Sequence, residues 1–147
     1  MDGFIFINNK NMNLQKRKGI TSYKGYYKSK ISNSIFHYDS MTELAMMIYY
    51  DNSNINWIKN TKLRIPYIFE NKKRNYIPDF ILSNVKIIEI KGSNDKPELP
   101  FKCDAAINYC QNNNMVFELI SYDDVKKLID WNIVKTYHFN DSKKLIF

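Results

Sequence analysis

The chain has 147 residues, of which 44% are hydrophobic and 15% aromatic, so we expect one globular domain with its own core and exclude a disordered chain. No stretch approaches the roughly 18 apolar residues that span a membrane, and the amino terminus lacks the basic-then-apolar pattern of a secretory signal, so we expect a cytoplasmic protein. Its 22 Lys and Arg exceed its 15 Asp and Glu, which suits a polyanionic partner, although an A·T-rich coding sequence would give the same excess.

Residues 1–37 are expected to form a basic amino-terminal arm. Residues 1–40 contain seven Lys or Arg against two Asp, and no sustained helix or strand period runs through the arm. Tyrosines alternate with the lysines, which is typical of a nucleic-acid surface but more often reflects packing of an arm on its domain. We expect a short hairpin at most, and we predict that three of the lysines bind nucleic acid: Lys24, Lys28 and Lys30.

A helix is predicted to open the main domain, residues 38–147. Asp39 or Ser40 can cap this helix, and Glu43 falls in its first turn, as in a capping box. Apolar residues then recur at helical spacing until the polar run 51–54 ends the pattern. The domain is therefore expected to begin with a capped helix that buries one face.

Three segments with strand character follow this helix. They are Trp57–Phe69, which Pro66 interrupts, Arg74–Leu82 and Val85–Lys91, with polar turns at Asn71-Lys72 and Ser83-Asn84. Next the pattern predicts a helix, a buried strand and a final amphipathic helix, at Phe101–Gln111, Met115–Ile120 and Asp123–Trp131. This order of elements predicts an α/β fold, a mixed sheet flanked by helices.

Two carboxylates and a lysine are predicted to meet at one end of this sheet. Side chains alternate along a strand, so Glu89 and Lys91 share one face while their apolar neighbours pack on the other. If the segments on either side of Ser83-Asn84 pair as a hairpin, Asp79 lies near Glu89. An acid and a lysine at this spacing also form ordinary exposed ion pairs, worth about 0–1 kcal/mol, but charges inside an otherwise apolar strand are costly when buried unpaired.

These groups suit metal-dependent hydrolysis of a phosphodiester bond. Carboxylate oxygens are hard ligands for Mg²⁺, which lowers the pKa of a bound water and neutralises charge that builds on the phosphate. A fixed ammonium group beside the metal orients the attacking water or stabilises the transition state. Glu43, on the preceding helix, can supply a third carboxylate.

Several strings of the sequence together resemble the PD-(D/E)XK nuclease superfamily. The most specific is Tyr76-Ile77-Pro78-Asp79-Phe80 followed by Glu89-Ile90-Lys91, and the others are Ser40-Met41-Thr42-Glu43-Leu44, Trp57, Ile65-Pro66-Tyr67 and the segment from Lys102 to Cys110. The resemblance runs from about Tyr38 to Ile120. It looks most like small phage-encoded endonucleases and the endonuclease subunit of Tn7-type transposases.

The resemblance implies a restriction-endonuclease-like core and assigns roles to single residues. The ligands it implies for Mg²⁺, or for Mn²⁺ in its place, are the carboxylates of Glu43, Asp79 and Glu89 and the backbone carbonyl group of Ile90. Lys91 would activate the nucleophile. A polar residue on the following helix would support the site, with Lys102 the first candidate and Gln111, at the helix end, the second.

The sequence thus predicts a metal-dependent DNA endonuclease, and the resemblance implies that a phage or mobile element encodes it. The arm and the basic segment 59–74 would hold the DNA backbone, the latter through Lys72, Lys73 and Arg74. A homodimer or a partner DNA-binding or recombinase protein would fit this function. Two rivals stay open: a partner-dependent transposase-like or homing endonuclease subunit, and a non-catalytic DNA-binding or phage structural module on the same scaffold.

Overall fold

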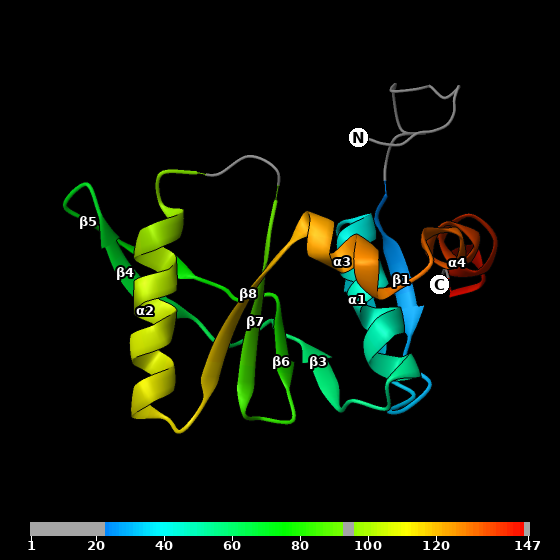
Figure 1. Cartoon of the computed structure of the whole chain (residues 1–147), viewed down its shortest axis with the longest axis horizontal. Coiled ribbons are helices and arrows are strands. Elements are labelled where there is room, and N and C mark those ends of the chain that lie inside the picture. The colour runs from blue at the N-terminus through cyan, green and yellow to red at the C-terminus, as the bar shows by residue number, and fades with distance from the viewer. Residues whose placement is uncertain (1–22, 93–95, 146–147) are drawn as a thin grey trace.

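A four-stranded mixed sheet forms the centre of the protein, in a computed structural model that describes residues 23–92 and 96–145 (Figure 1). In sheet order the strands are β3 (Trp57–Lys59), β6 (Phe80–Leu82), β7 (Lys86–Lys91) and β8 (Val116–Ser121). The first three pair antiparallel, whereas β7 and β8 are parallel. Helix α2 (Leu99–Asn112) makes the crossover that such a parallel pair requires.

Both faces of the sheet are covered by other elements. Consecutive residues of β7 point to opposite faces: Ile88 joins one buried cluster, and Ile87 joins the other. The first cluster forms against α1 (Met41–Asn52), α3 (Tyr122–Leu128) and α4 (Trp131–Thr136), and the second against α2 and the hairpin of β4 (Ile65–Phe69) with β5 (Lys72–Tyr76). This arrangement confirms the predicted α/β class, and none of the helices in the described ranges is long and apolar enough to cross a membrane.

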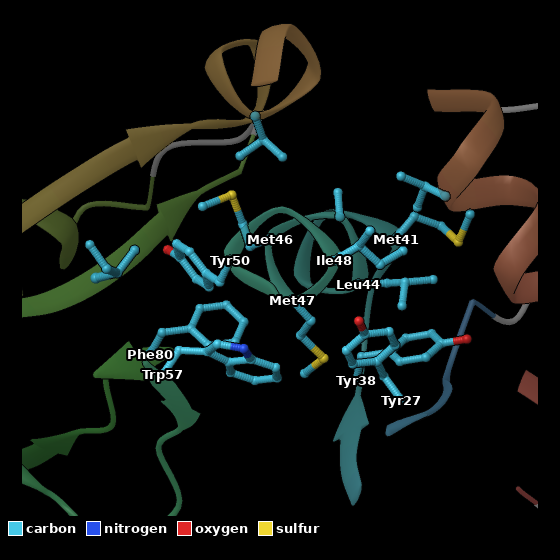
Figure 2. Close-up of a cluster of buried hydrophobic side chains, with 14 residues drawn as sticks. Tyr27, Tyr38, Met41, Leu44, Met46, Met47, Ile48, Tyr50, Trp57 and Phe80 are labelled. Carbon is cyan, nitrogen blue, oxygen red and sulfur yellow. The ribbon is translucent and has the colours of Figure 1, made fainter. Parts of the chain in front are cut away.

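Helix α1 begins with the predicted cap. The Ser40 Oγ accepts a hydrogen bond of 3.1 Å from the backbone N–H of Glu43, while Glu43 Oε1 accepts one of 2.8 Å from the backbone N–H of Asp39. The first bond satisfies an N–H group that a helix start otherwise leaves unpaired, and the second ties Glu43 to the residue before the cap. Beyond the cap, most of α1 is buried, and Figure 2 shows its side chains surrounded by aromatic residues from the neighbouring strands. The cap therefore fixes both the start of α1 and the side chain of Glu43.

The predicted turn at Ser83-Asn84 is confirmed. Both residues have a positive φ, of 50° and 60°, which is the conformation that a two-residue hairpin turn with the twist of its strands requires. In the register of β6 against β7, Leu82 is opposite Lys86 and Phe80 is opposite Ile88, so Val85 is one extra residue after the turn. A second pair of positive-φ residues, Glu70 and Asn71, joins β4 to β5 without an extra residue, one residue earlier than the sequence pattern predicts.

Two of the three predicted strand segments, Trp57–Phe69 and Arg74–Leu82, are each divided into two strands. The reason is that the chain leaves the central sheet between β3 and β6. The side-chain amide of buried Asn60 accepts hydrogen bonds from the backbone N–H groups of Lys62 and Leu63, and donates to the carbonyl groups of Leu63 and Pro78. This local network ends β3 and turns the chain outward. The β4–β5 hairpin is consequently an insertion beside the sheet, and α1, β3, β6, β7, α2 and β8 keep the predicted order.

Two expectations for the carboxyl-terminal part need correction. The strand β8 is at the edge of the sheet and is only partly covered, with Val116 59% exposed, so it is not the buried strand predicted. The predicted helix Asp123–Trp131 is α3, which ends at Leu128, and the sequence analysis did not predict α4, which starts at Trp131. Asp130 adopts an extended conformation and caps α4 through a hydrogen bond of 2.9 Å from the Asn132 N–H. Short π and 3-10 turns, Tyr137–Asp141 and Ser142–Leu145, follow.

The predicted hairpin in the amino-terminal arm is confirmed for its described part. Strands β1 (Gly25–Lys28) and β2 (Ile35–Tyr38) pair antiparallel, and the side chains of Tyr27 and Tyr38 are fully buried against α1. The hairpin thus packs on the same core as the sheet. Residues 1–22 lie outside the described residues, so a separate arm over 1–37 stays a prediction.

Candidate active site

The predicted cluster of charged residues lies at the edge of the sheet where β7 ends. In Figure 1 the carboxyl end of β7 and the amino-terminal ends of α1 and α2 all lie toward this upper edge. The backbone N–H of Asp79 donates a hydrogen bond of 3.1 Å to the carbonyl group of Ile88, and Asp79 Oδ2 accepts one of 2.8 Å from the N–H of Ile90. These two bonds hold the Asp79 carboxylate beside Glu89, as the hairpin argument predicts.

Asp79 and Glu89 are close enough for their carboxyl groups to interact directly. Burial raises the pKa of Glu89, and the charge of Asp79 raises it further. Burial also raises the pKa of Asp79, where the charge of Glu43 acts in the same direction. A hydrogen bond between the two carboxyl groups is consistent with Glu89 holding a proton that Asp79 accepts. The pair therefore resists carrying two negative charges unless a cation is near.

Tyr76 fixes the orientation of Glu89. Its hydroxyl group donates a hydrogen bond of 2.6 Å to Glu89 Oε1, and its side chain is only 3% exposed. The sequence analysis did not assign this role, since strand alternation says which face a side chain takes but not which group it meets across the sheet. Tyr76 is thus part of the candidate site.

Glu43 reaches the site from the first turn of α1. Its Oε1 atom lies 3.1 Å from the Nζ of Lys59, a residue that the sequence analysis counted only as part of a basic segment. Lys59 ends β3, and the next residue, Asn60, donates a backbone hydrogen bond of 2.9 Å to the carbonyl group of Asp79. Three segments far apart in the sequence therefore meet at this point.

The two predicted lysines come from different elements, β7 and α2. Lys91 is half-buried and follows Glu89 by two residues on β7, so it is on the same face of that strand. Lys102 lies in the first turns of α2, where its charge lowers the pKa of Glu89 and its Nζ lies 5.8 Å from the centre of the Tyr76 ring. Gln111 lies nine residues further along α2, about 13 Å away, which leaves Lys102 as the candidate near the site.

The residues predicted to bind nucleic acid lie on two hairpins. Lys24, Lys28 and Lys30 are exposed on or beside the β1–β2 hairpin, and Lys72 and Lys73 are exposed on β5. The two hairpins lie toward opposite ends of the molecule in Figure 1. Arg74 differs, because its Nη1 forms an ion pair of 3.0 Å with Glu98, just before α2.

The acidic side chains do not form a ready-made metal cage. Within residues 23–92 and 96–145 no group of three or more His, Cys, Asp or Glu side chains has the spacing to hold a metal ion. Glu43 is instead held by Lys59, while Asp79 and Glu89 form a pair. The chemistry available at this edge is therefore two interacting carboxyl groups, a third carboxylate nearby, and lysines from neighbouring elements.

The fold and the charged edge together define the class of protein. A mixed sheet covered on both faces, with an acid before one strand and an E-x-K sequence on the next, is a restriction-endonuclease-like α/β fold. Residues 51–122 match the family of TnsA-like endonucleases, over the domain that the family description calls N terminal. This match fits the relation to the PD-(D/E)XK nucleases that the sequence predicts, and it supports a nuclease- or transposase-related role. No curated protein and no solved structure matches it.

Proposed function

We propose that the protein is a metal-dependent DNA endonuclease whose reaction centre is the Asp79–Glu89 pair with Lys91. The observation that carries this proposal is the contact between two buried carboxyl groups at the end of β7. Burial raises the pKa of both, the charge of Asp79 raises that of Glu89 further, and the charge of Glu43 raises that of Asp79. When both carboxyl groups are ionised and no cation is near, such a pair lowers the stability of the folded state. Carboxyl groups with strongly shifted pKa values are typical of functional sites. The match to TnsA-like endonucleases supports the same chemistry.

The donor set fits a hard divalent cation. Asp79 and Glu89 would hold Mg²⁺, with the backbone carbonyl group of Ile90 and the carboxylate of Glu43 as further oxygen donors. Mg²⁺ favours carboxylate oxygens and retains several waters, so a complete protein cage is not required. When bound, the cation would polarise the phosphate and lower the pKa of a water molecule, and Mn²⁺ would substitute for it.

The chain's own side chains would prepare this centre. Lys91, on the same face of β7 as Glu89, would orient the attacking water or stabilise negative charge on the phosphate. Lys102 favours the ionised form of Glu89 through its charge, and Tyr76 holds the Glu89 side chain in one orientation by its hydrogen bond. A catalytic role for these residues rests on the resemblance and on their placement.

The exposed lysines would hold the DNA backbone. We propose Lys24, Lys28, Lys30, Lys72 and Lys73 as phosphate contacts, which position a duplex without specifying its sequence. Arg74 already pairs with Glu98, so its proposed contact to DNA would require that ion pair to break.

A partner-dependent subunit is the second candidate function, favoured by the description of the matched family. A TnsA-like endonuclease domain suggests work beside other transposase subunits, one of which would select the site. A homodimer, a phage or mobile-element origin, and a nuclease domain spanning residues 38–147 stay predictions. A partner-dependent subunit would have the same proposed reaction centre, and only the protein that directs it to DNA would differ.

The test is cleavage of supercoiled plasmid and of branched DNA with Mg²⁺, Mn²⁺ or EDTA. We expect metal-dependent nicking or linearisation, lowered by about 10²–10⁴-fold in Asp79→Asn and in Lys91→Met. Lys86→Met is the matched control, because Lys86 lies at the other end of β7 in a surface ion pair with Glu118. Cleavage that survives in both site variants would overturn the assignment of the centre. No cleavage by folded wild type, alone or with a recombinase partner, would overturn the nuclease proposal.

A further inference from the structure

Lys59 is held by three oxygen atoms from two different elements. Its Nζ lies 2.7 Å from the carbonyl oxygen of His37, 3.1 Å from Asp39 Oδ2 and 3.1 Å from Glu43 Oε1. The side chain is only 15% exposed. The contacts with His37 and Asp39 are hydrogen bonds, and the contact with Glu43 is an ion pair.

The contacts of Glu43 are concentrated on one of its two oxygen atoms. Both the backbone N–H of Asp39 and the Nζ of Lys59 bind Oε1, and Oε2 takes part in neither contact. A carboxylate held through one oxygen keeps the lone pairs of the other for a further ligand. Glu43 also lies close enough to Asp79 for its negative charge to raise the pKa of Asp79.

We propose that Lys59 is a positioning residue of the nuclease centre, which holds Oε1 of Glu43 so that Oε2 is presented to the divalent cation. This inference rests on the proposed function and adds a residue that neither the motif nor the family match assigns. Because Lys59 ends β3 and Asn60 is bonded to the backbone of Asp79, the same segment sets the position of both acids.

Direct contact of Lys59 with the phosphate is the alternative, and the geometry argues against it. The Nζ of Lys59 already contacts the His37 carbonyl group and the carboxylates of Asp39 and Glu43, and reaching a phosphate would break these contacts. Residues that support metal ligands typically change metal affinity by about 10–100-fold when they are removed. The effect of Lys59 should therefore pass through Glu43, which a double-mutant cycle measures.

The experiment is Mn²⁺ binding by titration calorimetry on the full chain without DNA. Variants are Lys59→Met, Glu43→Gln and the double variant, with Lys86→Met as the control for loss of one lysine from a surface ion pair. Lys59→Gln is a second variant that removes the charge but retains amide donors for the His37 carbonyl group. Circular dichroism establishes that each variant is folded.

We expect Lys59→Met to weaken Mn²⁺ binding by about 10–100-fold in the wild-type background and by less than about twofold when Glu43→Gln is already present. Lys59→Gln should weaken Mn²⁺ binding as much as Lys59→Met does, and Lys86→Met should bind Mn²⁺ with the affinity of wild type. Equal losses in both backgrounds, or no loss in either, would overturn the role of Lys59 while leaving the nuclease proposal intact. A folded wild type that binds no Mn²⁺ and cleaves no DNA would overturn the proposed function, and this role with it.

Discussion

The hydroxyl group of Tyr76 donates a hydrogen bond of 2.6 Å to Glu89, and both residues belong to strands beside the candidate centre. A second tyrosine, Tyr67, donates a similar bond of 2.7 Å to Glu98, which lies outside the centre. Both tyrosines are buried, and only the pair of Tyr76 with Glu89 includes a proposed metal ligand. This pairing supplies a matched comparison.

Tyr76→Phe should lower cleavage by about 10-fold at neutral pH and shift the acidic limb of the pH profile upward. The hydrogen bond from Tyr76 lowers the pKa of Glu89, so its loss raises the pH at which Glu89 ionises. The measurement is kcat/KM for plasmid nicking between pH 5 and 9, on Tyr76→Phe and on Tyr67→Phe. An equal shift in the two variants would show that the effect is general to the fold and not specific to Glu89.

The carboxyl pair should lower stability as the pH rises. The folded-state pKa is raised from 3.8 to about 6 for Asp79 and from 4.5 to about 8 for Glu89, so the folded state binds more protons than the unfolded state between these values. Their contribution is therefore fully favourable below about pH 4 and is lost by about pH 8. A difference of one in pKa corresponds to about 1.4 kcal/mol.

Glu89→Gln, measured in EDTA, should therefore raise the melting temperature above that of wild type at pH 8 and leave it nearly equal at pH 4.5. Added Mg²⁺ should stabilise wild type more than the variant, because only wild type has the repulsion that a cation relieves. Thermal unfolding at several pH values, with and without Mg²⁺, measures both. A gap between the two proteins that stays constant with pH would contradict this account.

Asp51 should be among the side chains most important for stability. Its buried carboxylate accepts hydrogen bonds from the hydroxyl groups of Tyr27 and Ser29, the backbone N–H of Lys30 and the indole N–H of Trp57, at 2.6 to 2.8 Å. Asp51→Ala leaves these donors unpaired and should cost roughly 2–5 kcal/mol in the free energy of unfolding by urea.

The control is Asp141→Ala, since Asp141 forms only an exposed pair with Lys144 and its loss should cost less than about 0.5 kcal/mol. The pKa of Asp51 is lowered despite its burial, because its hydrogen bonds favour the ionised form. Its contribution is present above pH 4 and declines as the pH falls below the ordinary pKa of an aspartate. Equal costs for the two substitutions would refute the role given to Asp51.

Lys72 and Lys73 should contribute to DNA affinity in a salt-dependent manner. Each substitution to Gln should reduce the slope of log affinity against log salt by about 0.9, if the lysine contacts a phosphate. Lys127, exposed on α3, provides the control, and Arg74→Gln should instead lower stability by releasing Glu98. Fluorescence anisotropy at several salt concentrations, in EDTA to prevent cleavage, measures the slopes. Unchanged slopes for both lysines would place the DNA elsewhere.

The features that the sequence predicted correctly are local. The capping box at Ser40 and Glu43 and the turn at Ser83-Asn84 are each complete within a few residues, so propensity and pattern decide them. The turn at Ser83-Asn84 also brings Asp79 beside Glu89, which lies only ten residues away in the sequence.

The features that the sequence did not predict depend on contacts between distant segments. Strand character runs through residues 57–69, and nothing in that pattern shows that Asn60 will bond to Pro78 and divide it. The contacts of Lys59 with Glu43 and of Arg74 with Glu98 likewise join residues 16 and 24 positions apart. Periodicity carries no information about such pairs, because it reports the face of an element and not its neighbour.

The hydrogen bonds of Asn60 also join the two ends of the β4–β5 insertion. The side chain of Asn60 binds the carbonyl group of Pro78, and its backbone N–H binds that of Asp79, so entry and exit are fastened together. The far end of the hairpin, at Glu70 and Asn71, can therefore lengthen, shorten or change its charge while Asp79 keeps its place. A fold built in this way lets the tip of the hairpin diverge during evolution while the candidate centre is inherited unchanged.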